Sequence, residues 1–183
     1  LGWRPDIVHA NDWHTAISLY SLCLQRGKAP FFENTRSVIS IHNLPFMGAG
    51  VEPVLRELGI PFSRDRHLPA WARKVPLPMG LSASDHINAV SPTYAKEITT
   101  PEYGSGLQDY LSACPERLSG ILNGLDTAAW DPSTDQALSA RFSVSTLAER
   151  PANKLALQRE FGLAEDPRTP LLWALRDAAN LTG

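Results

Sequence analysis

The most constraining feature of the sequence is a short apolar run that ends in two polar residues. Val38, Ile39 and Ile41 form a β-branched run, and His42 and Asn43 follow it directly. Such a run favours a strand buried on both faces, as in the interior of a parallel sheet. In open α/β sheets, ligands bind at the carboxyl ends of the strands. The run therefore predicts a buried strand that holds a polar pair where a ligand would bind.

Strand-like and helical patterns alternate along the first two thirds of the chain. A strand over residues 6–10 leads into a helix over 13–25, whose apolar residues recur at helical spacing. A strand, a helix and a further strand in this order predict a crossover connection and a parallel sheet. The predicted fold class is therefore α/β, with a Rossmann-like parallel sheet and helices. The pattern continues with strands over 86–91 and 118–122 and helices over 51–58, 77–84, 92–99 and 107–113.

Each of the four predicted strands ends in polar residues or is followed directly by them. Because the carboxyl ends of parallel strands meet at one edge of a sheet, we expect several of these residues to lie close together. Amides, an imidazole and a carboxylate can exchange hydrogen bonds with hydroxyl groups, so this edge suits the recognition of a sugar. The residues are Asn11, Asp12, His42, Asn43, Ser91 and Asn123.

Some of these residues also have a purely structural interpretation. Asp12 lies just before the first predicted helix and can cap it, and Ser91, which precedes Pro92, is a typical N-cap. Asn123 precedes Gly124, and Asn-Gly is a common turn pair. The sequence favours the cap for Ser91 and leaves both roles open for Asp12 and Asn123.

A metal site is a competing interpretation of His9, Asp12 and His14, which lie close together in the sequence. Against it, His9 falls inside a predicted strand and His14 inside the first turn of a predicted helix, so their side chains need not converge. Ordinary histidines are favoured, and neither a metal nor another cofactor is predicted. The sequence also contains no phosphate-binding glycine fingerprint and no nucleophile elbow, which argues against those enzyme classes.

The composition argues against several kinds of partner. The 183 residues carry a net charge of −2 without a basic stripe, which argues against nucleic acid. No run approaches the roughly 20 apolar residues of a membrane span, and the first residues do not resemble a signal peptide. Cys23 and Cys114 lack metal-ligand or redox spacing. We therefore expect a cytoplasmic protein that has no membrane partner and binds small or neutral ligands.

A composition change marks a domain boundary. Residues 127–151 are rich in Asp, Ser, Thr and Pro and show little periodicity, which is typical of a linker. A helix over 152–161 and an apolar run over 170–175, predicted to be a strand, follow. We therefore expect residues 1–126 to form part of a first domain and residues 127–183 to form a linker and the start of a second α/β domain. The apolar run at the very start indicates a beginning in mid-domain.

Several segments resemble motifs of bacterial glycogen synthases and plant starch synthases, in the same order. The first contains His-Ala-Asn-Asp-Trp-His, the second Ile-His-Asn-Leu, the third Val-Ser-Pro-Thr-Tyr and the fourth Leu-Asn-Gly-Leu-Asp. Together with Trp130 and the helix around Asn153, the resemblance covers most of the chain. The four segments are residues 5–14, 41–44, 89–104 and 120–126.

The resemblance implies the GT-B architecture, in which two Rossmann-like domains face each other across the active site. It also implies that glucose passes from a nucleotide sugar, usually ADP-glucose, to the non-reducing end of an α-1,4-glucan such as glycogen. The transfer retains the anomeric configuration and needs no metal. Asp12 and His42 match catalytic positions that line the glucosyl pocket. The substrate-binding positions implied are Asn123, Trp13, His14 and Asn43.

The chain departs from the family at both ends. The family begins with a lysine-containing glycine loop that contacts the nucleotide sugar, and this chain starts after that position. The family's second domain opens with an arginine and a Lys-Gly that hold the donor phosphates, whereas Arg176 is followed by no lysine. Residues 45–50 also differ from the family pattern. We therefore expect this chain alone to be an inactive fragment. The alternatives are another GT-B glycosyltransferase and a non-catalytic glucan-binding module.

Overall fold

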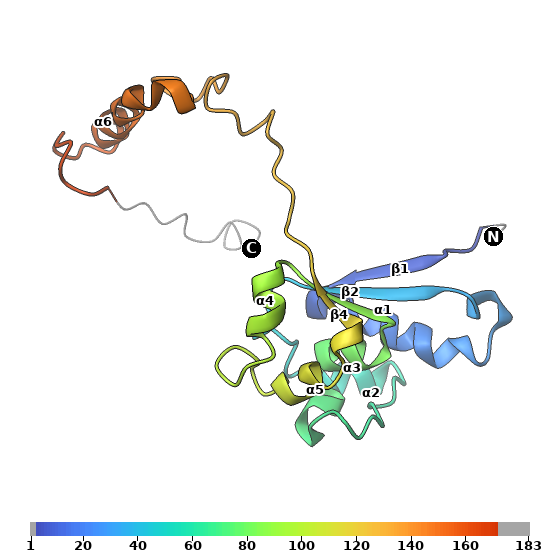
Figure 1. Cartoon of the computed structure of the whole chain (residues 1–183). Helices are drawn as coiled ribbons and strands as arrows, with labels where there is room; N and C mark the ends of the chain where they lie inside the picture. Colours follow the sequence, from blue (N-terminus) through green and yellow to red (C-terminus); the bar gives the residue numbers. More distant parts are fainter. Residues whose placement is uncertain (1–2, 172–183) are drawn as a thin grey trace. The chain divides into compact units, whose positions relative to one another are not determined.

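The computed structural model describes residues 3–171. The chain separates into two compact units, and the division lies between Asn123 and Gly124. The first unit alternates strands and helices (Figure 1). Its elements are β1 (Ile7–Asn11), α1 (Asp12–Arg26), η1 (Pro30–Phe32), β2 (Arg36–Ile41), α2 (Glu52–Glu57), η2 (Ala70–Lys74), α3 (Pro76–Ala83), β3 (His86–Ala89), α4 (Pro92–Glu97), α5 (Gln108–Ser112), η3 (Pro115–Arg117) and β4 (Leu118–Gly120).

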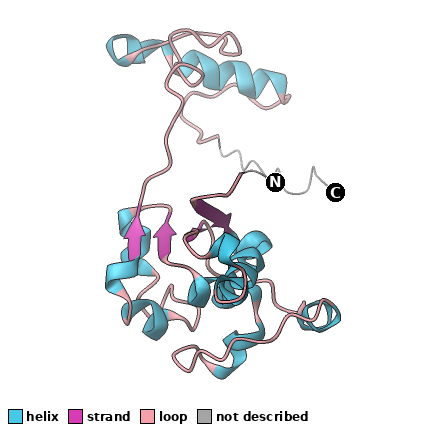
Figure 2. Ribbon diagram, turned by 90° about the vertical axis from the view of Figure 1, so that its right-hand side faces the viewer, coloured by secondary structure: helices cyan, strands magenta, loops and turns pink. Residues whose placement is uncertain are grey.

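The four strands form one parallel sheet in the order β1-β2-β3-β4. In register, Ala10 pairs with Ile39, Ile39 with Ile87, and Ile87 with Leu118. Each parallel neighbour needs a crossover, and helical segments lie between every two successive strands in the chain. Figure 2 shows helices beside the strands. The predicted α/β class with a parallel sheet is therefore confirmed.

The core lies on one face of the sheet. Ile39 and Ile41 of β2 and Ile87 and Ala89 of β3 are fully buried there. Burying one isoleucine side chain stabilises a fold by about 1.5–3 kcal/mol, so this face contributes strongly to stability. The residues that α1 and α3 contribute to the same core include Ala16, Leu19, Leu77 and Leu81.

Helices α1 and α3 approach each other closely at Gly80. A Cβ atom on Gly80 would lie 2.7 Å from the Cβ atom of Ala16 and 2.7 Å from the Ala16 carbonyl oxygen. No side chain fits at that separation, so only glycine allows this contact. The contact fixes the position of α1, which begins at Asp12.

The opposite face of the sheet carries polar side chains. His9 Nε2 and Ser40 Oγ hydrogen-bond across 2.8 Å, and Asn88 donates to the same Ser40 oxygen across 3.2 Å. His86 Nε2 and Ser119 Oγ form a further pair at 2.7 Å. These pairs connect neighbouring strands through their side chains, in addition to the backbone ladder.

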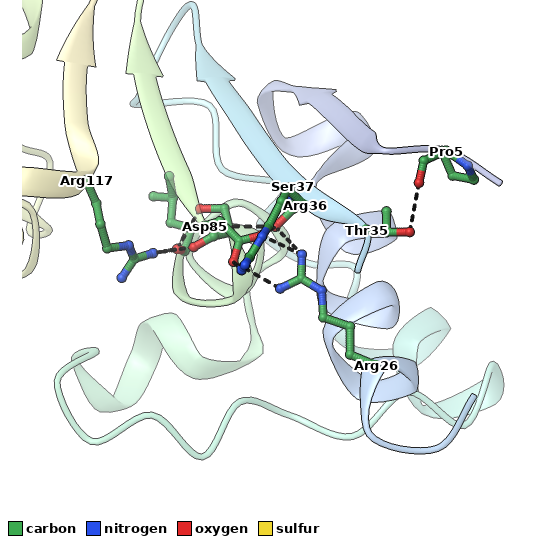
Figure 3. A network of polar contacts seen from close by, with 9 residues as sticks. Pro5, Arg26, Thr35, Arg36, Ser37, Asp85 and Arg117 are labelled. Carbon is green, nitrogen blue, oxygen red and sulfur yellow. Dashed lines mark hydrogen bonds and ion pairs between the residues drawn. The ribbon is translucent and has the colours of Figure 1, made fainter. Parts of the chain in front are cut away.

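A network around Asp85 joins the amino ends of β2 and β3 to the last turn of α1 (Figure 3). The Asp85 carboxylate accepts from the Ser37 backbone N–H at 2.7 Å, from the Ser37 hydroxyl at 2.8 Å, and from both terminal nitrogens of Arg26. Burial raises the pKa of Asp85, but the hydrogen bonds from Arg26 and Ser37 outweigh it and leave the pKa below its usual value.

Strand β4 is shorter than predicted. The sequence predicts a strand over 118–122, but the strand ends at Gly120, and Ile121 and Leu122 are 64% and 72% exposed. At Gly120 a Cβ atom would lie 2.2 Å from the Ser91 carbonyl oxygen, so the strand here runs directly against the start of α4. The predicted strand is therefore wrong at Ile121 and Leu122, whose apolar side chains lie beyond its end.

The second unit contains η4 (Val144–Glu149) and α6 (Pro151–Glu160), close to the predicted helix over 152–161. The Asn153 side chain accepts from the Ala140 N–H and donates to the Ala140 carbonyl, at 2.9 and 2.7 Å. The strand predicted over 170–175 lies almost entirely outside the described residues. Among the described residues, no helix is long and apolar enough to cross a membrane.

Candidate functional site

The candidate site begins where β1 meets α1. Asn11 is the last residue of β1, and Asp12 is the first residue of α1, with a positive φ of 50°. Left-handed backbone is costly for most residues, but Asp and Asn tolerate it because their short polar side chains can hydrogen-bond nearby. This conformation therefore marks Asp12 as a position where the fold needs an unusual backbone.

The Asp12 side chain holds the end of the neighbouring strand. Its Oδ1 atom accepts from the backbone N–H of His42 at 2.7 Å and from that of Asn43 at 3.3 Å. Within residues 3–171, no side chain caps the amino end of α1. The capping alternative for Asp12 is therefore wrong, since the carboxylate spans from β1 to the residues that follow β2.

The side chains of His42 and Asn11 also meet. His42 Nε2 and Asn11 Oδ1 lie 3.0 Å apart, and both side chains are exposed. Two separate hydrogen-bonding contacts, one from Asp12 and one from Asn11, thus fix the residues that follow β2. The predicted meeting of polar groups at the carboxyl edge of the sheet is confirmed for β1 and β2.

Trp13 and His14 lie beside this group. Their rings are 4.1 Å apart between centroids and tilted by 30°. The Trp13 indole is half-buried against the core and lies under Gly48, where a Cβ atom would be 2.6 Å from Trp13 Cε3. Trp13 therefore supports the loop after β2 from below, while His14 is exposed.

Further contacts anchor the same loop, residues 42–50. The Tyr94 hydroxyl of α4 accepts from the Leu44 backbone N–H at 2.9 Å, and the Met47 carbonyl accepts from the Leu77 N–H at 3.1 Å. A half-buried tyrosine hydroxyl usually finds a polar partner, but only the fold shows which one. Tyr94 was not singled out from the sequence, because nothing in its spacing points to Leu44.

The ends of β3 and β4 contribute less to this group. Ser91 caps α4, since its hydroxyl accepts from the Tyr94 backbone N–H at 2.9 Å, which confirms the predicted N-cap. Asn123 is exposed, three residues beyond the end of β4. Among the described residues, no hydrogen bond joins Asn123 to Asp12 or His42.

The residues of the competing metal interpretation are engaged separately. His9 hydrogen-bonds Ser40, His14 stacks on Trp13, and Asp12 binds the backbone after β2. In the part of the chain that the structure describes, no three histidine, cysteine or acidic side chains are grouped as metal ligands would be.

A cavity of about 440 Å³ lies between α4, α5 and β4, and neither Asp12 nor His42 lines it.

Comparison with known proteins shows which family the chain resembles. The model of the family described as starch synthase catalytic domain matches residues 1–113. The glycogen synthase of Paracidovorax citrulli is 45% identical over 172 residues, which are 90% of this chain and 33% of that protein. The glycogen synthase of Methylocella silvestris is 45% identical over 174 residues, which are 93% of this chain and 35% of that protein.

Similarity extends to a solved structure, the catalytic domain of starch synthase IV from Arabidopsis thaliana, which is bound to ADP and acarbose. The TM-score is 0.68 at 31% identity, and the match covers 89% of this chain and 34% of that one. The chain thus spans about a third of the length of the relatives that it matches. By its sequence and its structure, the chain belongs to the starch synthase catalytic domain family.

Proposed function

We propose that this chain supplies the acceptor-side wall of a glycogen or starch synthase active site, in which glucose passes from ADP-glucose to an α-1,4-glucan. The observation that carries the proposal is the contact of Asp12 with the backbone of His42 and Asn43. That contact presents an imidazole and an amide together at the carboxyl edge of a parallel sheet, where α/β proteins bind ligands.

The residue types suit glycosyl transfer. The bond between glucose C1 and the diphosphate breaks, a bond to an acceptor hydroxyl oxygen forms, and the hydroxyl proton leaves with the diphosphate. A retaining transfer develops positive charge on the sugar ring, which a carboxylate stabilises. We assign that electrostatic role to Asp12 and hydrogen bonds with sugar hydroxyls to His42 and Asn43.

We assign further substrate contacts to three residues around Asp12 and His42. Trp13 and His14 shape the acceptor side, and Asn123 contributes a hydrogen bond to the glucosyl group. The ADP and acarbose bound to the similar Arabidopsis domain support a nucleotide-sugar donor and a glucan acceptor. The free thiols of Cys23 and Cys114 suit a reducing compartment, and we propose a cytoplasmic location.

The proposal is tested by exchange with a relative. In a chimera, this chain replaces the matching third of the Paracidovorax citrulli glycogen synthase, and incorporation of labelled glucose from ADP-glucose into glycogen is measured. We expect the chimera to transfer glucose and the chain alone to transfer none, because proximity to the donor site is required. His42→Ala should lower turnover about a hundredfold, as does removal of one preorganised contact to a transition state.

His67→Ala is the matched control, since this exposed histidine bonds only Asp65 within its own loop among the described residues. It should leave turnover unchanged. An inactive but folded chimera that still binds maltohexaose would replace the proposal with a non-catalytic glucan-binding module. Full activity of His42→Ala would overturn the site assignment.

A further inference from the structure

Asn11 lies at the N-cap of α1 but does not cap it. Asparagine is among the residues preferred at this position because its side chain can accept from the first free N–H groups of a helix. Here the Asn11 backbone hydrogen-bonds the Thr15 hydroxyl through both its N–H and its carbonyl, at 2.6 and 2.8 Å. The side-chain oxygen instead lies 3.0 Å from His42 Nε2 on the next strand. The Asn11 side chain therefore links the end of β1 to the residue after β2 and does not cap the helix.

The chemistry of this contact determines which ring nitrogen carries a proton. The Asn11 atom that faces the ring is the amide oxygen, which only accepts hydrogen bonds, so in this orientation His42 Nε2 donates. A neutral imidazole that donates from Nε2 has an unprotonated Nδ1, which accepts. No hydrogen bond of Nδ1 is present among the described residues. The ring thus has an acceptor free for a hydroxyl group.

We propose that Asn11 is a positioning residue that holds the His42 ring in its Nε2–H form, so that Nδ1 accepts a hydrogen bond from a sugar hydroxyl. This inference rests on the proposed function and deepens it. Asn11 itself touches no substrate, and its effect passes through the ring. The hydroxyl-bearing ligand would be recognised as a donor to Nδ1, and Asp12 would hold the His42 backbone independently.

The orientation of the Asn11 amide decides which ring nitrogen of His42 carries the proton. If the amide nitrogen faced the ring, it would donate to Nε2, and Nδ1 would carry the proton instead. Asn11→Asp separates these cases because a carboxylate has acceptor oxygens alone. It should preserve the Nε2–H form, whereas Asn11→Ala removes the partner and should release the ring into a mixture of both forms.

The experiment is nitrogen NMR on the 183-residue chain with labelled histidine, at a pH where the ring is neutral, with His42 assigned from a His42→Gln sample. We expect the Nε2–H pattern in the unsubstituted chain and in Asn11→Asp, and averaged signals in Asn11→Ala. Asn34→Ala is the control, since Asn34 is exposed and precedes the opposite end of β2. An Nδ1–H pattern in the unsubstituted chain, or no change in Asn11→Ala, would overturn the proposal.

The kcat and KM of the chimera give a second test, because a purely structural role of Asn11 would not lower kcat selectively. Asn11→Ala should lower kcat about tenfold with little change in KM for glycogen, and Asn11→Asp should restore most of it. An unchanged kcat in Asn11→Ala would contradict the positioning role. If the unsubstituted chimera is inactive, the proposed function fails, but the nitrogen spectra still decide whether Asn11 holds the ring.

Discussion

The Asp12 carboxylate accepts a hydrogen bond from the backbone N–H of His42 at 2.7 Å. This bond joins the residue after β1 to the residue after β2. The acceptor residue has a positive φ of 50°, so the fold places an uncommon backbone conformation at this junction. Local strain of this kind costs energy and persists where surrounding contacts enforce it. At this site, the contact and the backbone conformation have separable effects on stability.

Substitution of Asp12 should separate them. Asp12→Asn keeps an acceptor and tolerates positive φ, Asp12→Gly keeps only the backbone freedom, and Asp12→Ala keeps neither. We expect the free energy of unfolding to fall in that order, with Asp12→Ala losing about 2 kcal/mol. Urea unfolding measures the series, and Asp109→Ala on α5 is an exposed control. Equal stability of the Gly and Ala variants would show that the backbone conformation carries no cost.

The loop that follows β2 should depend on Gly48. Gly48 and Gly50 both have positive φ, of 79° and 89°, but only Gly48 lies against Trp13. Gly48→Ala strains the backbone and also places a Cβ atom against Trp13. Gly50→Ala strains the backbone alone, because its added Cβ atom has no described atom within 4 Å apart from its chain neighbours. We expect Gly50→Ala to lose about 1 kcal/mol and Gly48→Ala clearly more. A larger loss for Gly50→Ala would contradict the packing against Trp13.

Tyr94 should stabilise the same loop from α4. Tyr94→Phe removes the hydroxyl that accepts from the Leu44 N–H and leaves that N–H without its partner. The expected loss is about 1–2 kcal/mol, with a fall in turnover of the chimera, because a backbone donor near His42 is released. Tyr103→Phe is the control, since Tyr103 is 48% exposed in another loop. If both variants unfold alike, the Tyr94 hydroxyl contributes nothing.

The sequence predicted the local features of this molecule well. Strand β2 and the Ser91 cap depend on residues close together in the chain, and both are found as expected. The partner of Asp12 could not be predicted, because it depends on the register that pairs Asn11 with Ser40 and brings the residues after β2 alongside. The sequence predicts Asn11 only as a polar residue at the end of a strand. Asparagine is common at helix N-caps and can also pair across strands, so the residue type alone does not show which partner its side chain has.

The Asp85 network was not predicted either, because an aspartate before a strand has no distinctive spacing. It predicts a specific pH dependence. Hydrogen bonds from Arg26 and Ser37 leave the folded-state pKa of Asp85 below its usual value although burial opposes them. A depressed folded pKa contributes stability that is present above the unfolded pKa, near 4, and is lost as the pH falls through the folded pKa. Stability should therefore decline on acidification below about pH 4.

Asp85→Asn tests this by removing the ionisable group while keeping a similar shape. At pH 7 the variant should lose about 2 kcal/mol, because the Arg26 guanidinium then faces a neutral amide and the hydrogen bonds from charged partners are weakened. Between pH 5 and pH 2 its unfolding free energy should fall less than that of the unsubstituted chain, so the two urea-unfolding curves converge in acid. Asp109→Asn, on the exposed surface of α5, should follow the unsubstituted chain throughout. Parallel curves for Asp85→Asn and the unsubstituted chain would place the acid sensitivity on other carboxylates and refute the role assigned to Asp85.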